Sequence, residues 1–233
     1  MKRAVSSVDS VVNWFEAGGG ADQESLDGVK ARGPLVLKHR GRAVAFEDFE
    51  WLAQEASIQV ARVRCFGARD LTTAGSVTLL LVPWSNDPKP FPSPSLVRTV
   101  KDYLDARRTP TADLAILGPA YVDVSVTAEV VPTSFEDADL VRRRVVVNLD
   151  AFLHPLTGGP ARAGWEFGRD VFLSEIAAIV EATEGVDHVR RVSLAGRSGA
   201  EDRTREGGRR VELDDVPGEL PAAGHHTITM AAS

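Results

Sequence analysis

Apolar and polar residues alternate most clearly in the middle of the chain. Between residues 122 and 130, every even position is Val or Ala and every odd position is polar. This period of two predicts a half-buried strand with one face in a core. Similar signals predict strands at 60–66 and 186–194, a nearly all-apolar central strand at 77–82, and extended pieces at 114–117, 211–213 and 227–230.

Other segments repeat apolar residues at helical spacing. The segment 46–56 carries acidic residues near its start, where they suit the helix dipole. Ser93 and Pro94 are typical of a helix start, and this helix is expected to end near Arg107. Three more helices are expected: one capped by Ser134 and running to Phe152, one over 172–180, and a weaker one that opens near Asp22 and ends at Gly33-Pro34.

The order of these elements is helix, strand, strand, helix, strand, followed by strand, helix, helix, strand. This order indicates an α+β protein with helices on one face of antiparallel sheets. Each half is similar to a split βαβ unit, so we expect two ferredoxin-like subdomains. The expected divisions are an extended N-terminal arm with a short helix (1–45), two α+β subdomains (46–118 and 119–195), and a charged loop with C-terminal strands (196–233).

Two loops have compositions that restrict their backbone shape. The glycine-rich loop, residues 154–169, contains four glycines and two prolines, and it carries Trp165, Phe167 and Arg169. A loop of this kind suits an active-site wall, a docking surface or a well-packed corner. The proline-rich loop, residues 83–94, places Trp84 and Phe91 among its prolines.

Charge and cysteine content exclude several classes of protein. The chain has 27 basic and 33 acidic residues, which argues against a general nucleic-acid binder. The single cysteine, Cys65, excludes an intrachain disulfide framework and a cysteine-based zinc cage. No apolar run approaches the ~20 residues that span a bilayer, and the N-terminus lacks a secretory pattern. We therefore expect synthesis in the cytoplasm.

The sequence contains no recognisable catalytic or cofactor motif. Neither a phosphate-binding Gly-x-x-x-x-Gly-Lys-Ser/Thr loop nor a Gly-x-Ser-x-Gly nucleophile elbow occurs. The five histidines are scattered, apart from the adjacent His225 and His226. Basic clusters at 142–144 and 190–191 fit either an acidic partner or a solvated face. No catalytic, cofactor-binding or metal-binding residue is therefore assigned.

Several motifs, taken in order, carry a resemblance to a known family. Residues 19–26 (Gly-Gly-Ala-Asp-Gln-Glu-Ser-Leu) are followed by 42–53 (Arg-Ala-Val-Ala-Phe-Glu-Asp-Phe-Glu-Trp-Leu-Ala). Later come Tyr121-Val122, the Pro-Leu-x-Gly-Gly and Gly-Trp-Glu-Phe-Gly-Arg runs of the glycine-rich loop, and the segment 219–226. Together they resemble the baseplate J-like proteins, which are baseplate assembly proteins of contractile phage tails and related injection systems.

The resemblance implies a structural role without a cofactor or enzymatic activity. Such proteins are wedge subunits of the ring around the central hub, and they help to trigger sheath contraction. The implied partners are further copies of the chain, a second wedge protein, a sheath-proximal subunit, and the hub or spike, within a phage tail or tail-like particle. Family members are usually longer at the N-terminus, so the resemblance leads us to expect a shortened paralogue, a separately encoded C-terminal half or a truncated product.

Interface candidates follow from aromatic and arginine content, since Trp and Arg dominate interface hot spots. They are Trp84, Phe91, Trp165, Phe167 and Arg169. The alternative for Trp165 and Phe167 is that they pack against their own helix. A second hypothesis for the whole chain is a small-ligand-binding regulatory domain with a pocket between paired ferredoxin-like units. A hydrolase with an unrecognised site is the third and least supported.

Overall fold

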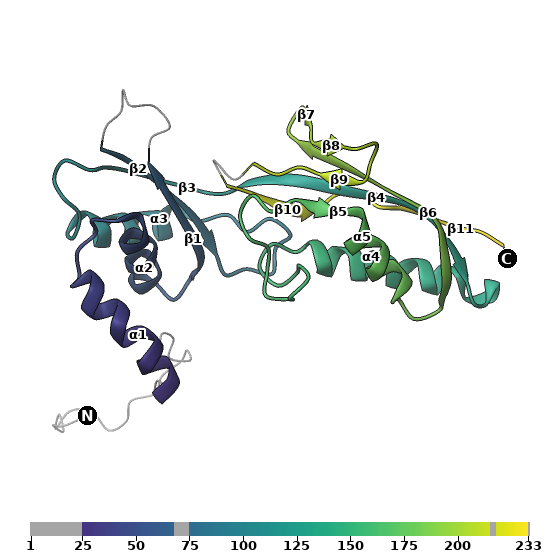
Figure 1. Cartoon of the computed structure of the whole chain (residues 1–233), viewed down its shortest axis with the longest axis horizontal. Coiled ribbons are helices and arrows are strands. Elements are labelled where there is room, and N and C mark those ends of the chain that lie inside the picture. Colours follow the sequence, from purple (N-terminus) through teal and green to yellow (C-terminus); the bar gives the residue numbers. More distant parts are fainter. Residues whose placement is uncertain (1–24, 68–74, 215–217, 233) are drawn as a thin grey trace, which may run out of the picture. The chain divides into compact units, whose positions relative to one another are not determined.

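The computed structural model describes residues 25–67, 75–214 and 218–232 (Figure 1). The chain divides into two units, Met1–Arg40 and Gly41–Ser233. In the first unit, helix α1 (Leu26–His39) begins after Ser25, whose Oγ accepts a hydrogen bond from the Gly28 N–H at 3.1 Å. The predicted end at Gly33-Pro34 is wrong, because Pro34 lies inside the helix. A proline removes one helical hydrogen bond, and here the helix continues past it.

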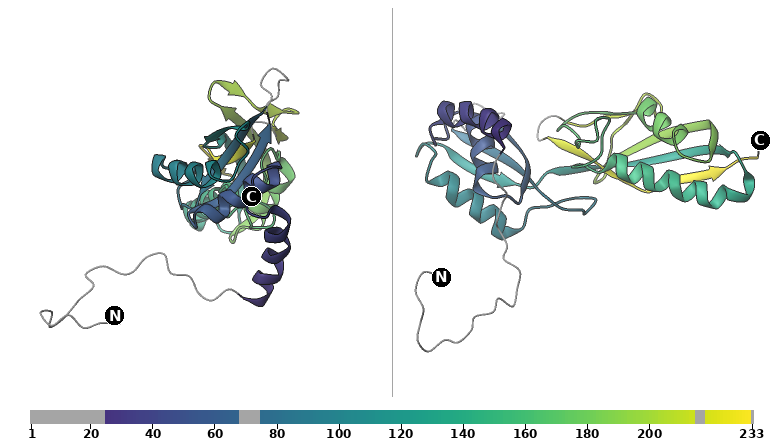
Figure 2. Two further views of the ribbon diagram at one scale, coloured as in Figure 1. Left: turned by 90° about the vertical axis from the view of Figure 1, so that its left-hand side faces the viewer. Right: turned by 90° about the horizontal axis from the view of Figure 1, so that it is seen from below.

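The first part of the second unit is a three-stranded sheet with two helices (Figure 2). Its strands are β1 (Val60–Gly67), β2 (Ser76–Pro83) and β3 (Asp113–Leu117), in the order β1-β2-β3. Helices α2 (Phe46–Ala56) and α3 (Pro94–Asp105) contribute to one buried cluster with this sheet. The predicted helix start at Ser93 is confirmed, since the Ser93 Oγ accepts from the Leu96 N–H at 3.2 Å.

The second part is built around the long strand β4 (Ala120–Pro132). Its neighbours are β6 (Val186–Ser198) on one side and the consecutive strands β10 (Glu219–Ala223) and β11 (Thr227–Met230) on the other. The short β7 (Glu201–Asp202) pairs with the end of β6. Helices α4 (Ala138–Leu153) and α5 (Leu173–Glu181) lie along one face of this sheet (Figures 1 and 2).

The alternation that predicted β4 is confirmed by burial. The apolar residues at even positions from Val122 to Val130 are at most 1% exposed. They pack with the inner face of α4, which presents Val141, Val145 and Leu149, as the helical spacing predicts. The start of this helix differs from the prediction, because a 3-10 turn over Phe135–Asp137 follows Ser134 and α4 begins only at Ala138.

The expected antiparallel sheets are wrong, because both main sheets are mixed. Strand β3 pairs parallel to β2, and β10 and β11 pair parallel to β4. The chain passes from β2 through α3 before it reaches β3, and such a crossover returns a strand in the same direction. The fold class is therefore mixed α+β with several sheets.

The charged segment 196–210, expected to be a loop, is largely ordered into strands. Strand β6 runs through Ser198, and β8 (Thr204–Arg205) and β9 (Arg210–Val211) form a small sheet with β5 (Val171–Phe172). The charges pair with each other, since Arg203 is buried and its Nη2 lies 2.9 Å from Asp214 Oδ2 and 3.0 Å from Glu219 Oε1. No helix in the described residues is long and apolar enough to cross a membrane.

Candidate functional site

The glycine-rich loop leaves the end of α4 and folds back over it. Trp165 is fully buried, and its indole N–H donates to the Phe152 carbonyl at 2.8 Å. The two rings pack edge to face, with centroids 5.3 Å apart and an angle of 82° between their planes. Such a contact adds about 0.5–1.5 kcal/mol beyond the burial of the rings. For Trp165, the structure therefore corresponds to the packed corner and not to an exposed contact residue.

Two glycines permit this tight return of the backbone. Gly164 has a φ of +86°, and a Cβ atom there would lie 2.6 Å from the Leu156 carbonyl oxygen. At Gly158, a Cβ atom would lie 2.0 Å from the Phe152 carbonyl oxygen. Both approaches are closer than real Cβ contacts, so only glycine fits. The shape of the loop thus depends on glycine at these two positions of its own sequence.

Phe167 and Arg169 are less buried than Trp165 but are also engaged within the chain. The Arg169 guanidinium lies 5.0 Å from the centroid of the Trp165 ring, and its Nη2 is 2.5 Å from Glu175 Oε1. The Arg169 side chain is 33% exposed, and Phe167 packs partly against the core around β4. These two residues thus support the buried tryptophan while each keeps some surface.

Strand β1 holds the same loop from the other side. The Arg62 guanidinium donates hydrogen bonds to the backbone carbonyls of Ala163 and Trp165. Burial lowers the pKa of Arg62, and the nearby Glu166 carboxylate acts in the opposite direction. A cation with two carbonyl acceptors fixes the loop against the strand. Arg62 is not among the candidates predicted from the sequence, where its only signal is its alternation with apolar residues in β1.

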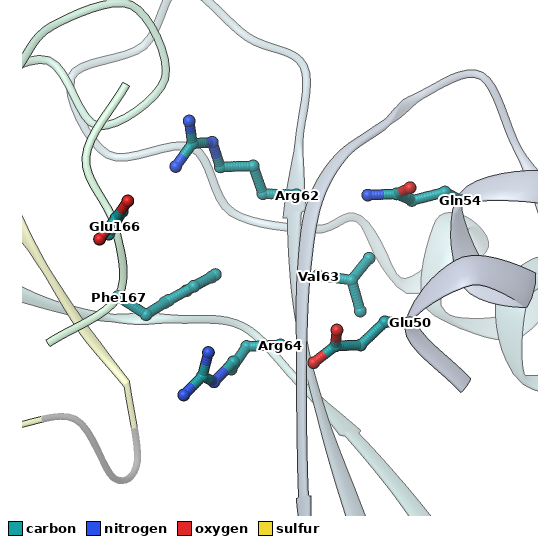
Figure 3. Close-up of a pocket in the computed structure, with 7 residues that line it drawn as sticks. All are labelled: Glu50, Gln54, Arg62, Val63, Arg64, Glu166 and Phe167. Atoms are coloured by element: carbon teal, nitrogen blue, oxygen red, sulfur yellow. The ribbon is translucent and has the colours of Figure 1, made fainter. Parts of the chain in front are cut away.

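A groove of about 490 Å³ lies beside this contact (Figure 3). Arg62 and Arg64 project from β1 toward Glu166 and Phe167, whereas Val63 projects toward helix α2. On the α2 side, Glu50 Oε1 accepts a hydrogen bond from the Cys65 N–H at 2.7 Å. The charged groups Glu50 and Arg62 thus bind backbone, and the groove holds no nucleophile paired with a base.

The proline-rich loop presents its aromatic side chains to solvent. Trp84 is 62% exposed and Phe91 is 67% exposed. The Trp84 N–H donates to the Gln59 carbonyl at 2.8 Å, next to Ile58, which is 78% exposed. Phe91 lies over Gly118, where a Cβ atom would come within 2.4 Å of the ring. Exposed aromatic side chains on a held backbone are typical of protein contact surfaces.

The backbone of the proline-rich loop is anchored to β4. The Tyr121 hydroxyl donates to the Pro90 carbonyl at 2.6 Å, and Lys89 Nζ lies 2.6 Å from Asp123 Oδ1. Burial raises the pKa of Tyr121, so the phenol stays protonated and remains a donor. The loop therefore displays Trp84 and Phe91 from a fixed position.

The five sequence-predicted interface residues thus fall into two groups. Trp165, Phe167 and Arg169 form one packed cluster, and Trp84 and Phe91 lie exposed on the other loop. Among the described residues, no group of three or more His, Cys, Asp or Glu side chains is arranged to hold a metal ion. Burial also raises the pKa of the Cys65 thiol to about 12, so Cys65 is not an activated nucleophile.

Comparison with known proteins adds a structural relationship. No protein family matches the chain, and no curated protein matches it. Among solved structures, a chain from the cryo-EM structure of the anti-feeding prophage baseplate, 6-fold symmetrised, matches with a TM-score of 0.68. The two share a fold. The match covers 88% of this chain at 18% sequence identity. It covers 43% of the baseplate chain, so this chain corresponds to less than half of that longer protein.

Proposed function

We propose that this chain is a structural component of the baseplate of a contractile tail or injection machine. The observation that carries the proposal is the fold, which matches a chain of the anti-feeding prophage baseplate along 88% of this chain. The motifs that resemble baseplate J-like proteins point to the same role. The chain acts by binding other proteins and catalyses no reaction.

Within the baseplate, we assign the chain to the wedge. Wedge subunits surround the central hub, and a change in their arrangement is coupled to sheath contraction. The partners are further copies of the chain, a second wedge protein, a sheath-proximal subunit, and the hub or spike. The exposed Trp84 and Phe91 on their anchored loop are the contact residues, because large aromatic side chains bury much area at low entropic cost.

The ligand-binding alternative has less support. Two of the charged groups around the groove in Figure 3, Arg62 and Glu50, are already hydrogen-bonded to backbone. A small-molecule site would instead present convergent polar groups that a ligand can satisfy.

The experiment is to tag the chain in its native cell and purify particles by sedimentation. We expect the tagged chain to sediment with sheath and tube proteins identified by mass spectrometry, and cryo-EM of the particles to place it in the baseplate ring. The double variant Trp84→Ser/Phe91→Ser should leave the particle fraction, whereas the surface variant Arg98→Ser on α3 should stay in it. A chain that remains monomeric beside intact particles contradicts the proposal.

A further inference from the structure

The edges of the first sheet are protected against pairing with another strand. A free edge exposes unpaired N–H and C=O groups, and proteins cover such groups to prevent unwanted association. On β1, the Cys65 N–H is capped by Glu50 at 2.7 Å. On β3, the Leu114 carbonyl accepts from Lys101 Nζ at 3.3 Å. On each of these edges, a side chain of a neighbouring helix therefore occupies one backbone group.

Two edges of the second sheet are protected in other ways. The pairing of β6 with β4 shifts register at two places. At these places the charged residues Asp187 and Arg190 of β6 have no residue opposite them on β4. Its far end is occupied, because the Leu194 N–H donates to the Gly208 carbonyl at 2.8 Å. On β10, the Gly168 N–H donates to the Glu219 carbonyl at 2.9 Å, and Pro221 has no N–H to offer.

Strand β11 lacks any such protection. Its sequence, Thr-Ile-Thr-Met, has high β-propensity and no charge. The Ala231 N–H donates to the Val130 carbonyl at 2.9 Å, so the backbone groups of Thr227 and Thr229 face β4. Those of Ile228 and Met230 then face away from the sheet. Within the described part of the chain, these outward N–H and C=O groups have no hydrogen-bond partner.

A groove of about 520 Å³ lies between this strand and α4. Its apolar lining comes from Val146 and Ile228, together with Val147, which is 63% exposed. Its charged lining comes from Arg142 and Arg143. Arg142 is partly neutralised by Asp139 at 2.8 Å, whereas Arg143 is exposed and makes no ion pair with the described residues. The groove is thus apolar at its base and positive at its rim.

We propose that β11 accepts an extended acidic segment of a partner protein as an added strand. The outward backbone groups of Ile228 and Met230 supply the hydrogen bonds, as in other complexes formed by strand addition. Apolar side chains on the face of the segment that points toward α4 fill the groove, and carboxylates on that same face, before and after the apolar residues, pair with Arg142 and Arg143. This surface is separate from the proline-rich loop, and the proposal holds whether or not the chain is a wedge subunit.

The charge of the groove favours an acidic partner over a second copy of the chain. Strand β11 has no acidic residue, so its pairing with β11 of another copy leaves the two arginines without carboxylates from that strand. Around a two-fold axis, such pairing also brings the arginine-rich rims of both copies toward each other, and like charges repel.

The test uses the full ¹⁵N-labelled chain and a synthetic acidic peptide, Glu-Thr-Val-Thr-Val-Thr-Glu-Thr, whose Val and Glu side chains share one face when it is extended. We expect NMR shifts and slowed hydrogen exchange at the Ile228 and Met230 amides. The same peptide with Lys in place of both Glu residues, and the acidic peptide with alternate amides N-methylated, should each bind roughly tenfold more weakly or worse. Arg143→Glu should weaken binding of the acidic peptide by a similar factor, while Arg98→Glu, the same charge change on exposed α3, should not.

Any of three results overturns the proposal. The first is equal binding of the acidic and basic peptides. The second is no binding of the acidic peptide at about 1 mM, a concentration that detects weak contacts. The third is a dimer in analytical ultracentrifugation whose Ile228 and Met230 amides are protected without peptide, since a second copy then covers the edge.

Discussion

The glycine-rich and proline-rich loops have similar ingredients and opposite outcomes. Each carries two large aromatic side chains on a backbone shaped by Gly or Pro. In the first loop, Trp165 is completely buried, whereas in the second Trp84 is 62% exposed. The difference lies in what holds each backbone. Arg62 and Phe152 bind the first loop around its tryptophan, while Tyr121 and Asp123 of β4 bind the second at Pro90 and Lys89, beside its aromatics. Aromatic content therefore marks a shaped loop, and the anchors decide whether its aromatic side chains are enclosed or exposed.

Replacement of the two tryptophans tests this contrast most directly. Trp165→Ala removes a buried ring and its hydrogen bond to the Phe152 carbonyl, so we expect a loss of about 3–5 kcal/mol in the free energy of unfolding. Trp84→Ala should cost within about 0.5 kcal/mol, as is usual for surface substitutions. Chemical denaturation followed by circular dichroism measures both. Equal losses for the two variants are incompatible with the contrast.

Substitution of glycine sharpens the comparison at the level of the backbone. Gly164→Ala introduces a Cβ atom 2.6 Å from the Leu156 carbonyl oxygen at a φ of +86°, so we expect a loss of about 1–3 kcal/mol. Gly199 also has a positive φ, +58°, but open space around its Cβ position. Gly199→Ala thus measures only the cost of a positive φ, without a steric clash. We expect it to lower the free energy of unfolding by less than Gly164→Ala does. If denaturation curves of the two variants coincide, the close approach at Gly164 has no energetic weight.

The sequence predicted the elements with strong periodicity and missed those that depend on distant contacts. The alternation in β4 and the amphipathic spacing of α2 were sufficient to predict these two elements, because burial of one face dictates each pattern. Strand β10 was missed, because it is short, contains Pro221 and is ordered by pairing with β4 about a hundred residues earlier. The anchor Arg62 binds Ala163, 101 residues away, which no local pattern reveals.

The interface candidates show the same limit. Trp84 and Trp165 both stand among Gly or Pro residues in sequence, and composition cannot tell which side chain is enclosed. Enclosure of Trp165 follows from tertiary partners, namely the Phe152 carbonyl and the Arg169 guanidinium. The loops were therefore predictable as shaped segments, but their roles were not.

The adjacent residues His225 and His226 show the same contrast between an exposed and a buried side chain. From this contrast we predict that the free energy of unfolding depends on pH. His226 is buried between β10 and β11, and its Nδ1 accepts from the Val126 N–H at 3.1 Å, whereas His225 is exposed. Burial lowers the pKa of His226, an effect only partly opposed by Asp150, whose Oδ1 lies 3.3 Å from Nε2. The unfolded chain therefore binds a proton more readily than the folded chain.

The sign follows from this difference in proton binding. The contribution of His226 to the free energy of unfolding is complete above the unfolded-state pKa of about 6.5. As the pH falls below that value, this contribution is lost by at most about 1.4 kcal/mol per pH unit. We expect the free energy of unfolding, measured between pH 7.5 and 5.5, to fall less steeply in His226→Asn than in the natural chain. His225→Asn is the control and should keep the full slope. A slope that is unchanged in both variants would show that protonation of His226 is not coupled to folding.

The smallest change in stability is expected where the proposed contact surface is removed. Trp84→Ser/Phe91→Ser takes two aromatic side chains away from positions that are more than 60% exposed, so each substitution should alter the free energy of unfolding by about 0.5 kcal/mol or less. The anchors Tyr121 and Asp123 bind the loop at Pro90 and Lys89 and remain in place. Sedimentation of the same variant with assembled particles should nevertheless be lost, because hot-spot aromatics act in the complex and not in the fold. A loss of stability as large as that of Trp165→Ala would mean that both loops are packed corners, and the distinction between them would then disappear.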